Sequence, residues 1–421
     1  MSKKEKYFYF ISISILSSFY LILYYYSLNF VINSWTFSTA HLDYSTGFVR
    51  RGLFGEIMNF FNTYLNFKNE FFFSFYYIFF TSINLILFFT LIKNFTNFKI
   101  IFIFLLFNPA LFLFQINDPF AFQRGETTII TLMLFHTLIV NLFFKGSLKK
   151  KNYIKILFFI LMPLLFLNIL IYEAQVFLIV FHMFLTINVF YKNFYFFQKK
   201  IYFDKNILYI LSYSVLLIPI FLILKSNISI EDVKYIFNNI SDKTNVNWEP
   251  LSLIPVSLFN ATLVDAQYMF KSKITVLTYS ALLFFSVGLI ILIFNYLIKL
   301  RFIKVQNYKH VFFSAIPLLI LFLVARDWGR WLSLVNYVFL LYFLQFPQNS
   351  FFSKKHYYNK VKNKAVNITF TFIVIFYIFF IEVPHCCANR SPFGGIYGNV
   401  KLFVDVNFIK NVNLNLKLKK Y

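Results

Sequence analysis

Long apolar stretches recur along this sequence and constrain its fold more than any other feature. A helix needs about 20 mostly apolar residues to cross the roughly 30 Å of hydrocarbon in a bilayer. About eleven such stretches occur, at 7–32, 71–92, 100–114, 127–144, 156–171, 174–191, 206–224, 274–298, 311–325, 332–347 and 367–383. We therefore expect an all-α polytopic membrane protein with about 11 transmembrane helices, in a single integral membrane domain over residues 1–421.

The composition excludes several other classes of protein. Hydrophobic residues make up 59% of the chain and charged residues only 13%, whereas soluble globular proteins average about 45–50% and about 25%. A soluble enzyme and a disordered chain are both excluded on this basis. The two cysteines, Cys386 and Cys387, are adjacent and cannot form a disulfide framework.

Lysines lie in every second connection between the apolar stretches, which predicts how the chain is oriented. Basic loops stay on the cytoplasmic side of a membrane. We therefore place the N-terminus inside and the outer loops at about 33–70, 115–126, 225–273 and 384–421, with short interfacial helices in them. The net charge of +24 is explained by this orientation, so the expected partner is the lipid bilayer and not a nucleic acid. The compartment expected is a bacterial inner (cytoplasmic) membrane.

The acidic residues and the arginines, which are rarer than the lysines, are distributed in the opposite way. In this topology 14 of the 16 acidic residues and six of the seven arginines lie at or beyond the outer ends of the spans. The positive-inside bias should move arginines the other way. Arginine binds phosphate or carboxylate with two parallel hydrogen bonds. The pattern predicts an outward-facing cavity for a phosphorylated, membrane-borne substrate, with structural ion pairing as the alternative.

The first outer loop contains the densest group of candidate residues. Asp43 is a candidate catalytic base, and Arg50 and Arg51 are candidate phosphate ligands at the start of a short amphipathic helix. The expected apolar stripe of that helix comprises Leu53, Ile57, Phe60, Phe61 and Leu65. The alternative is an interfacial helix whose two arginines reach towards lipid headgroups.

Further candidates lie at the outer ends of later spans. Glu126 is a second candidate catalytic carboxylate, and Arg124, Arg326 and Arg330 are candidate phosphate ligands. Arg326 and Arg330 are four residues apart and hence on one helical face. The possible supporting residues are Asp118, Glu173 and Asp327. The alternative is that these charges form ion pairs with a structural role only, because charged side chains near a membrane need partners.

The layout resembles that of GT-C integral membrane glycosyltransferases. The likeness lies in a long first outer loop that contains Asp43 and the GFVRRGLFG stretch, and in a short junction between the third and fourth spans with Asp118, Arg124 and Glu126. The FQRGE stretch there is similar to an Arg-x-Glu element found at this junction in some members. Tyr44 follows Asp43 where the family commonly has a second acid. The Phe- and Lys-rich bias also resembles bacterial O-antigen polymerases. The resemblance implies an outward-facing site and a polyprenyl-phosphate sugar donor.

The function expected is therefore glycosyl transfer at the outer face, from a polyprenyl-linked saccharide to a glycan acceptor. One alternative is a polymerase of repeat units carried on undecaprenyl pyrophosphate. Another is a non-enzymatic transporter of lipid-linked saccharides or an envelope scaffold. No cofactor motif and no metal site is present in the sequence, and a divalent cation, oriented by Glu126 or Asp118, is left open.

Overall fold

The computed structural model describes residues 3–29, 34–46, 48, 51–117, 122–191, 205–225, 229–241, 246–248, 251, 270, 272–300, 302–303, 309–324, 327–347 and 364–384. These residues form helices, which confirms the all-α prediction. The helices of the first half are α1 (Lys3–Asn29), α2 (Ser34–Thr39), α3 (Gly52–Leu65), α4 (Asn69–Ile92), α5 (Lys99–Phe107), α6 (Phe112–Asn117), α8 (Glu126–Phe144), α9 (Lys150–Ile156), α10 (Met162–Ile171) and α11 (Ile179–Phe190). Those of the second half are α12 (Lys205–Leu211), α13 (Leu217–Lys225), α14 (Ile230–Ser241), α17 (Lys273–Lys299), α18 (His310–Val324), α19 (Trp328–Leu344) and α21 (Lys364–Phe380).

Four short turns of tighter or wider helix connect or extend these elements: η1 (Lys93–Asn97), η2 (Leu157–Leu161), η3 (Glu173–Leu178) and η4 (Ser212–Leu216). η2 is a π turn, in which the Met162 N–H bonds the carbonyl five residues back, at Leu157. Pro163 explains its position, because proline has no N–H to offer the preceding turn. The chain therefore stays helical from α9 through α10.

Seven of the helical segments within the described ranges are long and apolar enough to cross a bilayer: Lys3–Asn29, Asn69–Thr96, Glu126–Phe144, Lys150–Ile171, Glu173–Phe190, Asn206–Leu224 and Lys273–Lys299. His310–Leu323 and Ile368–Phe380 are shorter apolar helices. The expected stretch at 100–114 is two helices, because Asn108-Pro109 ends α5 before α6 begins. A helical membrane protein is supported, and the count of about 11 spans stays a prediction.

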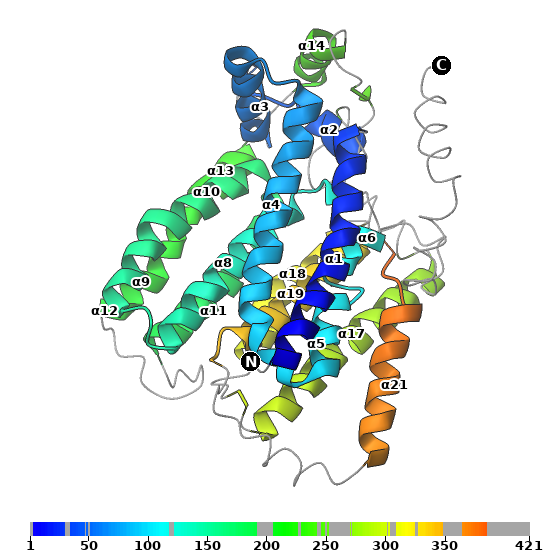
Figure 1. Ribbon diagram of the computed structural model, residues 1–421. Coiled ribbons are helices and arrows are strands. Elements are labelled where there is room, and N and C mark those ends of the chain that lie inside the picture. Colours follow the sequence, from blue (N-terminus) through cyan, green and yellow to red (C-terminus); the bar gives the residue numbers. More distant parts are fainter. Residues whose placement is uncertain are drawn as a thin grey trace.

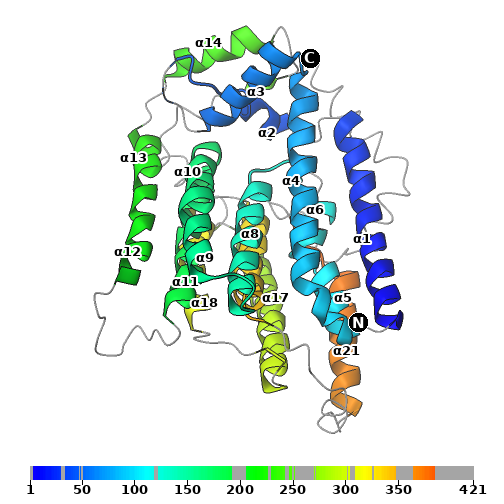
Figure 2. The same ribbon diagram turned by 60° about the vertical axis from the view of Figure 1, so that its left-hand side comes forward.

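The centre of the bundle is formed by α8 and α19, which pack against each other. Every residue of α19 is buried, as expected for a helix that is apolar on all sides. The helices α17 and α18 pack on α19, and α4 and α11 pack on α8. Figures 1 and 2 show this layered arrangement of long helices. The N-terminal ends of α8 and α19 thus lie inside protein.

The helices α2, α3 and α14 lie together at one end of the molecule, and α1 begins at the opposite end in both views (Figures 1 and 2). Leu42 packs with Val233 and Ile236 of α14 in a small apolar cluster of its own. The short helix expected within residues 33–70 is confirmed as α3.

The face of α3 that is buried in the protein differs from the apolar stripe predicted for the helix. Phe54 and Met58 are the buried large side chains of the helix, whereas Phe60 is 55% exposed. Gly55 explains the rotation, because a Cβ there would lie 1.9 Å from the Leu42 carbonyl oxygen. The glycine face of α3 therefore packs against the chain near Leu42, and the predicted stripe is turned partly outwards.

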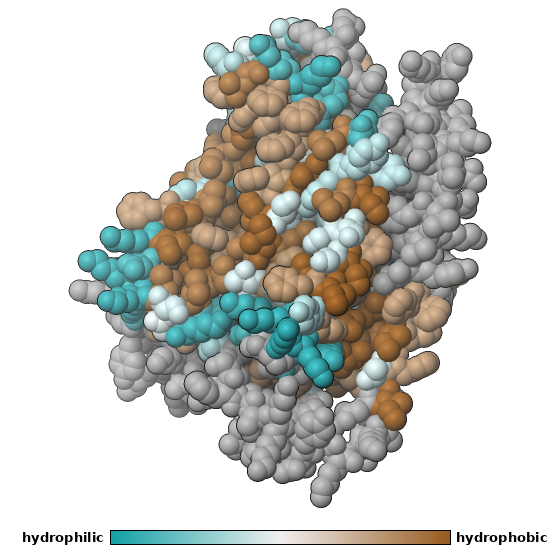
Figure 3. All heavy atoms as spheres, viewed as in Figure 1, coloured by the Kyte–Doolittle hydropathy of each residue, from teal (hydrophilic) through white to brown (hydrophobic). Residues whose placement is uncertain are grey.

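The described surface has an apolar belt between two more polar ends (Figure 3). The exposed lysines of the described segments include Lys3 and Lys4 at the start of α1 and Lys149, Lys150 and Lys151 at the start of α9. An apolar belt between polar ends is the distribution that a bilayer imposes on a helical bundle.

Candidate functional site

The first part of the candidate site is the N-terminal end of α8. Glu126 is the first residue of this helix and is buried. A carboxylate is stabilised there by the positive end of the helix dipole. Gly125 precedes it, and a Cβ at this position would lie 2.4 Å from the ring of Tyr172. The absence of a side chain at Gly125 therefore allows the Tyr172 ring to approach Glu126.

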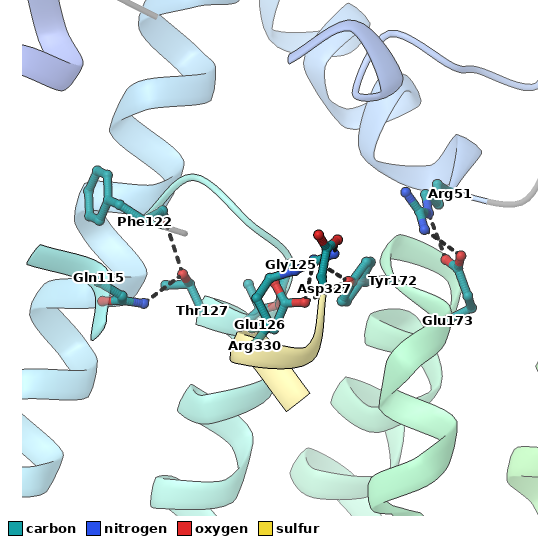
Figure 4. A network of polar contacts seen from close by, with 11 residues as sticks. Arg51, Gln115, Phe122, Gly125, Glu126, Thr127, Tyr172, Glu173, Asp327 and Arg330 are labelled. Carbon is teal, nitrogen blue, oxygen red and sulfur yellow. Dashed lines mark hydrogen bonds and ion pairs between the residues drawn. The ribbon is translucent and has the colours of Figure 1, made fainter. Parts of the chain in front are cut away.

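Arg330, in the first turn of α19, pairs with two carboxylates (Figure 4). Its Nη1 donates to Glu126 Oε1 at 2.6 Å and to the Tyr172 hydroxyl at 3.0 Å. Its Nη2 forms an ion pair with Asp327. The Tyr172 hydroxyl in turn donates to Glu126 Oε1 at 2.7 Å. The side chains of Arg330 and Glu126 are only 7% and 8% exposed, so this is a buried, hydrogen-bonded ion pair.

A second ion pair lies on the other side of Tyr172. Arg51 donates from Nε and Nη2 to the two oxygens of Glu173, at 2.7 and 2.5 Å. Its guanidinium also lies 5.1 Å from the centroid of the Tyr172 ring. Burial lowers the pKa of Arg51, but the adjacent Glu173 outweighs it and the net pKa is raised. Arg51 is therefore held charged in a two-pronged pair.

The backbone of Arg51 is itself unusual. Its φ of 67° lies in the left-handed region, which costs a non-glycine residue of order 1 kcal/mol or more. The residue immediately precedes the first residue of α3. The strained conformation directs the guanidinium at Glu173, on the hairpin between α10 and η3, instead of into solvent (Figure 4). Because such strain persists only where the surroundings hold it, the Glu173 pair is part of what fixes this turn.

Several buried polar atoms at the Arg330 end have no hydrogen-bond partner: Glu126 Oε2, Arg330 Nε, Trp328 Nε1 and Trp331 Nε1. The Arg330 guanidinium lies 5.0 Å from the centroid of the Trp331 ring. Buried polar groups are nearly always satisfied in native proteins. One acceptor and one donor are thus left open within the ion pair itself, Glu126 Oε2 and Arg330 Nε, and two further donors belong to tryptophans in the same turn of α19.

A second layer of side chains supports the site from within the bundle. Thr128 donates to the Gly125 carbonyl and to Asn168 Oδ1, both at 2.8 Å. Asn168 donates to Gln175 at 3.0 Å. Gln115 Nε2 donates to Thr127 at 3.3 Å, and Thr127 donates to the Phe122 carbonyl at 3.1 Å (Figure 4). These uncharged contacts hold the first turn of α8 in place.

The structure brings together some of the residues predicted from sequence. Glu126, Asp327 and Arg330 are in direct contact, as are Arg51 and Glu173. Arg124 lies two residues before Glu126, and its carbonyl accepts a hydrogen bond from the Thr127 N–H at 3.0 Å. The remaining three candidates, Arg50, Asp118 and Arg326, lie outside the described residues.

Asp43 has different partners from the rest. Its oxygens accept hydrogen bonds from the Ser45 hydroxyl at 2.5 Å and from Asn59 of α3 at 2.8 Å. None of the hydrogen bonds found among the described residues joins Asp43 to a candidate arginine. Its predicted role as catalytic base stays a prediction.

Sequence reasoning missed the residue that joins the two ion pairs. Tyr172 contacts Arg51, Glu126, Arg330 and Gly125. Its position was readable, because it precedes Glu173 in the very short connection between two expected spans, but one tyrosine among 29 gives no local signal. Among the described residues, no group of three or more His, Cys, Asp or Glu side chains could hold a metal ion.

Comparisons with known proteins found no match: no family model, no curated protein and no solved structure is similar to this chain. The likeness to GT-C glycosyltransferases and O-antigen polymerases therefore stays a prediction made from the sequence.

Proposed function

We propose that this protein transfers a sugar from a polyprenyl-phosphate carrier to a glycan acceptor, at the outer face of a bacterial cytoplasmic membrane, in the assembly of a surface polysaccharide. The apolar bundle supports a substrate that is reached from the membrane. The candidate site lies where α3 meets the bundle (Figure 4), towards the end at which α2, α3 and α14 lie. By the distribution of lysines, this is the expected outer end.

One observation carries the proposal: two ion pairs from four separate segments converge on Tyr172. They are Arg51–Glu173 and Arg330–Glu126, with Asp327 on the second arginine. A buried ion pair adds little to stability compared with an apolar replacement. Ionisable residues within a membrane protein are rare and are usually functional. We interpret the pairs as a site retained for ligand chemistry.

The reaction needs two kinds of group. The acceptor hydroxyl needs a base, for which Asp43 is the candidate, and the departing phosphate needs a cation close to it. Arg51 and Arg124 are partly buried, and among the described residues they are the candidates for binding the phosphate. Arg330 is more deeply buried than Arg51 and is paired with two carboxylates, so Glu126 and Arg330 are better suited to orienting a substrate.

The proposal is tested by deleting the gene and measuring the surface glycan and its lipid-linked precursors by mass spectrometry. We expect the loss of one sugar or branch, with restoration by the wild-type gene and no restoration by Arg51→Ala. Lys150→Gln, at the start of α9, is the matched control and should restore the glycan fully.

Other outcomes would contradict the proposal in different ways. A single repeat unit in place of long chains would identify a polymerase. Precursor trapped on the cytoplasmic side would identify a transporter. A glycan unchanged by the deletion would exclude all three carbohydrate functions.

A further inference from the structure

Carboxylates outnumber guanidiniums at the Arg330 end of the site. Arg330 is paired with both Glu126 and Asp327, and Arg51 is paired with Glu173. Among these five side chains, three carboxylates face two guanidiniums. An anion placed beside Arg330 would therefore compete with two carboxylates that already contact it. This end of the site is poorly suited to a phosphate.

The unpartnered atoms indicate a different kind of ligand. Glu126 Oε2 can only accept a hydrogen bond, whereas Arg330 Nε and Trp331 Nε1 can only donate one. The side chains of Glu126 and Arg330 are each less than one tenth exposed. A hydroxyl group can donate and accept at once. A small molecule with several hydroxyl groups would form hydrogen bonds with the acceptor and the neighbouring donors at the same time, and it would add no charge.

We propose that Glu126, Arg330 and Trp331 form the binding subsite for an uncharged sugar, and that the carrier phosphate binds elsewhere, towards Arg51. One sugar hydroxyl donates to Glu126 Oε2, and others accept from Arg330 Nε and Trp331 Nε1. This inference rests on the proposed function and narrows its substrate to a neutral saccharide. A uronic acid is disfavoured, because its carboxylate would lie beside Glu126 and Asp327.

Tyr172 and Gly125 give this subsite its geometry. The Tyr172 hydroxyl and Arg330 Nη1 both bond Glu126 Oε1, which leaves Oε2 as the open oxygen. Gly125 makes room for the Tyr172 ring. The open oxygen is thus held in a fixed direction before any ligand binds, which reduces the entropy lost on binding.

The test is a binding measurement on the full chain in lipid nanodiscs. The probes are undecaprenyl phosphate alone and undecaprenyl phosphate bearing glucose, galactose, mannose or glucuronate. A hydrogen bond to a charged group contributes about 1.5–3 kcal/mol, which corresponds to about tenfold or more in Kd. We expect at least one neutral-sugar lipid to bind about tenfold more tightly than undecaprenyl phosphate alone, and the glucuronate lipid to gain nothing.

Two variants assign that difference to the subsite. Glu126→Gln and Trp331→Phe should each remove most of the gain from the sugar, while the Kd for undecaprenyl phosphate alone changes less than about twofold. Trp331→Phe keeps an aromatic ring against Arg330 and loses only the indole N–H, so it serves even where Glu126→Gln fails to fold. Arg51→Ala is the contrasting variant and should weaken every probe alike.

The outcomes separate this inference from the proposed function. If Glu126→Gln and Trp331→Phe weaken undecaprenyl phosphate as much as its sugar conjugates, the subsite holds phosphate and the inference is wrong. A glucuronate lipid that binds more tightly than every neutral one, or no gain from any neutral sugar, would also overturn it. If the wild-type protein binds none of the five lipids, the proposed function fails as well.

Discussion

Two buried polar networks adjoin α8, and they differ in charge. At the N-terminal end of the helix, Glu126, Arg330 and Asp327 form a charged group with unpartnered atoms. Farther along α8, His136 bonds His182 of α11 and Tyr153 of α9, both at 3.0 Å. The second network contains no carboxylate and no guanidinium.

The neutral network is almost completely satisfied. Tyr153 contacts Thr186 at 3.1 Å, Thr186 contacts Tyr213 at 2.9 Å, and Tyr213 donates to the His182 carbonyl at 3.1 Å. Within it, His182 Nε2 is the unpartnered side-chain atom. The two networks thus differ in place: uncharged hydrogen bonds tie helices together inside the bundle, whereas the charged side chains lie at the helix ends.

The largest expected effect on stability comes from removing one of the two charges of the Glu126–Arg330 pair. Arg330→Met leaves the buried Glu126 without its cation, which should destabilise the fold by about 3–5 kcal/mol. The double variant Glu126→Gln with Arg330→Met removes both charges and should recover at least half of that loss. Thermal unfolding in detergent measures the stability of the single and of the double variant. Equal instability of the single and double variants would show that the pair is not the reason.

The second-largest effect is a pH dependence of stability, which comes from a buried neutral histidine outside both networks. His41, two residues after the end of α2, bonds the Phe37 carbonyl at 2.8 Å. Burial lowers its pKa from 6.5 to about 4. The unfolded chain therefore takes up a proton at about pH 6.5 that the folded chain resists. Stability from this residue is complete above pH 6.5 and is lost as the pH falls towards 4, by about 3 kcal/mol in all.

The check is thermal unfolding of the wild type and of His41→Gln at pH 7, 5.5 and 4.5. Glutamine can keep a hydrogen bond but does not titrate, so the variant should lose less stability over this interval. A pH dependence identical in the two proteins would mean that other groups cause it.

Gly125→Ala should have an intermediate effect confined to the charged network. The new methyl group would lie 2.4 Å from the Tyr172 ring, and overpacking of this kind costs about 1–3 kcal/mol. Displacing Tyr172 should also reduce sugar transfer. Gly288→Ala is the matched control, because nothing lies within 4 Å of a Cβ there. It should be neutral or slightly stabilising, and a similar loss in both variants would exclude crowding of Tyr172 as the cause.

The smallest effect is expected in the neutral network. Thr186→Val removes one hydroxyl, but Tyr153 keeps its contact with His136 and Tyr213 keeps its bond to the His182 carbonyl. The loss should be about 1 kcal/mol, with the surface glycan unchanged. If the variant is stable but fails to restore the glycan, the neutral network has a role in function, and the contrast drawn between the two networks is wrong.

The long helices could be predicted from sequence because apolar length is a local property. The amphipathic pattern that follows Arg51 is local too, and the helix predicted there is present as α3. The buried face of α3 was not predicted correctly, because Gly55 packs against Leu42 through a missing side chain. Spacing along one helix carries no information about such a contact.

The candidate site was predictable in its charges but not in its pairings. Charged residues at the ends of apolar spans are easily seen, and several of them do meet. Their partners depend on which helix ends lie side by side: Glu126 meets Arg330 across 204 positions of sequence, and Arg51 meets Glu173 across 122. Tyr172 joins them without carrying any charge, so no rule based on charge could have found it.

The most direct test of the account uses the double variant Glu126→Gln with Arg330→Met in a deletion strain. Its stability should lie closer to that of the wild type than to that of Arg330→Met, because Glu126 no longer carries a buried unpaired charge and Asp327 is partly exposed. Mass spectrometry of the surface glycan then separates folding from function. We predict that the wild-type gene restores the missing sugar and that the stable double variant does not. Full restoration by the double variant would contradict the claim that this ion pair is retained for the chemistry of the site.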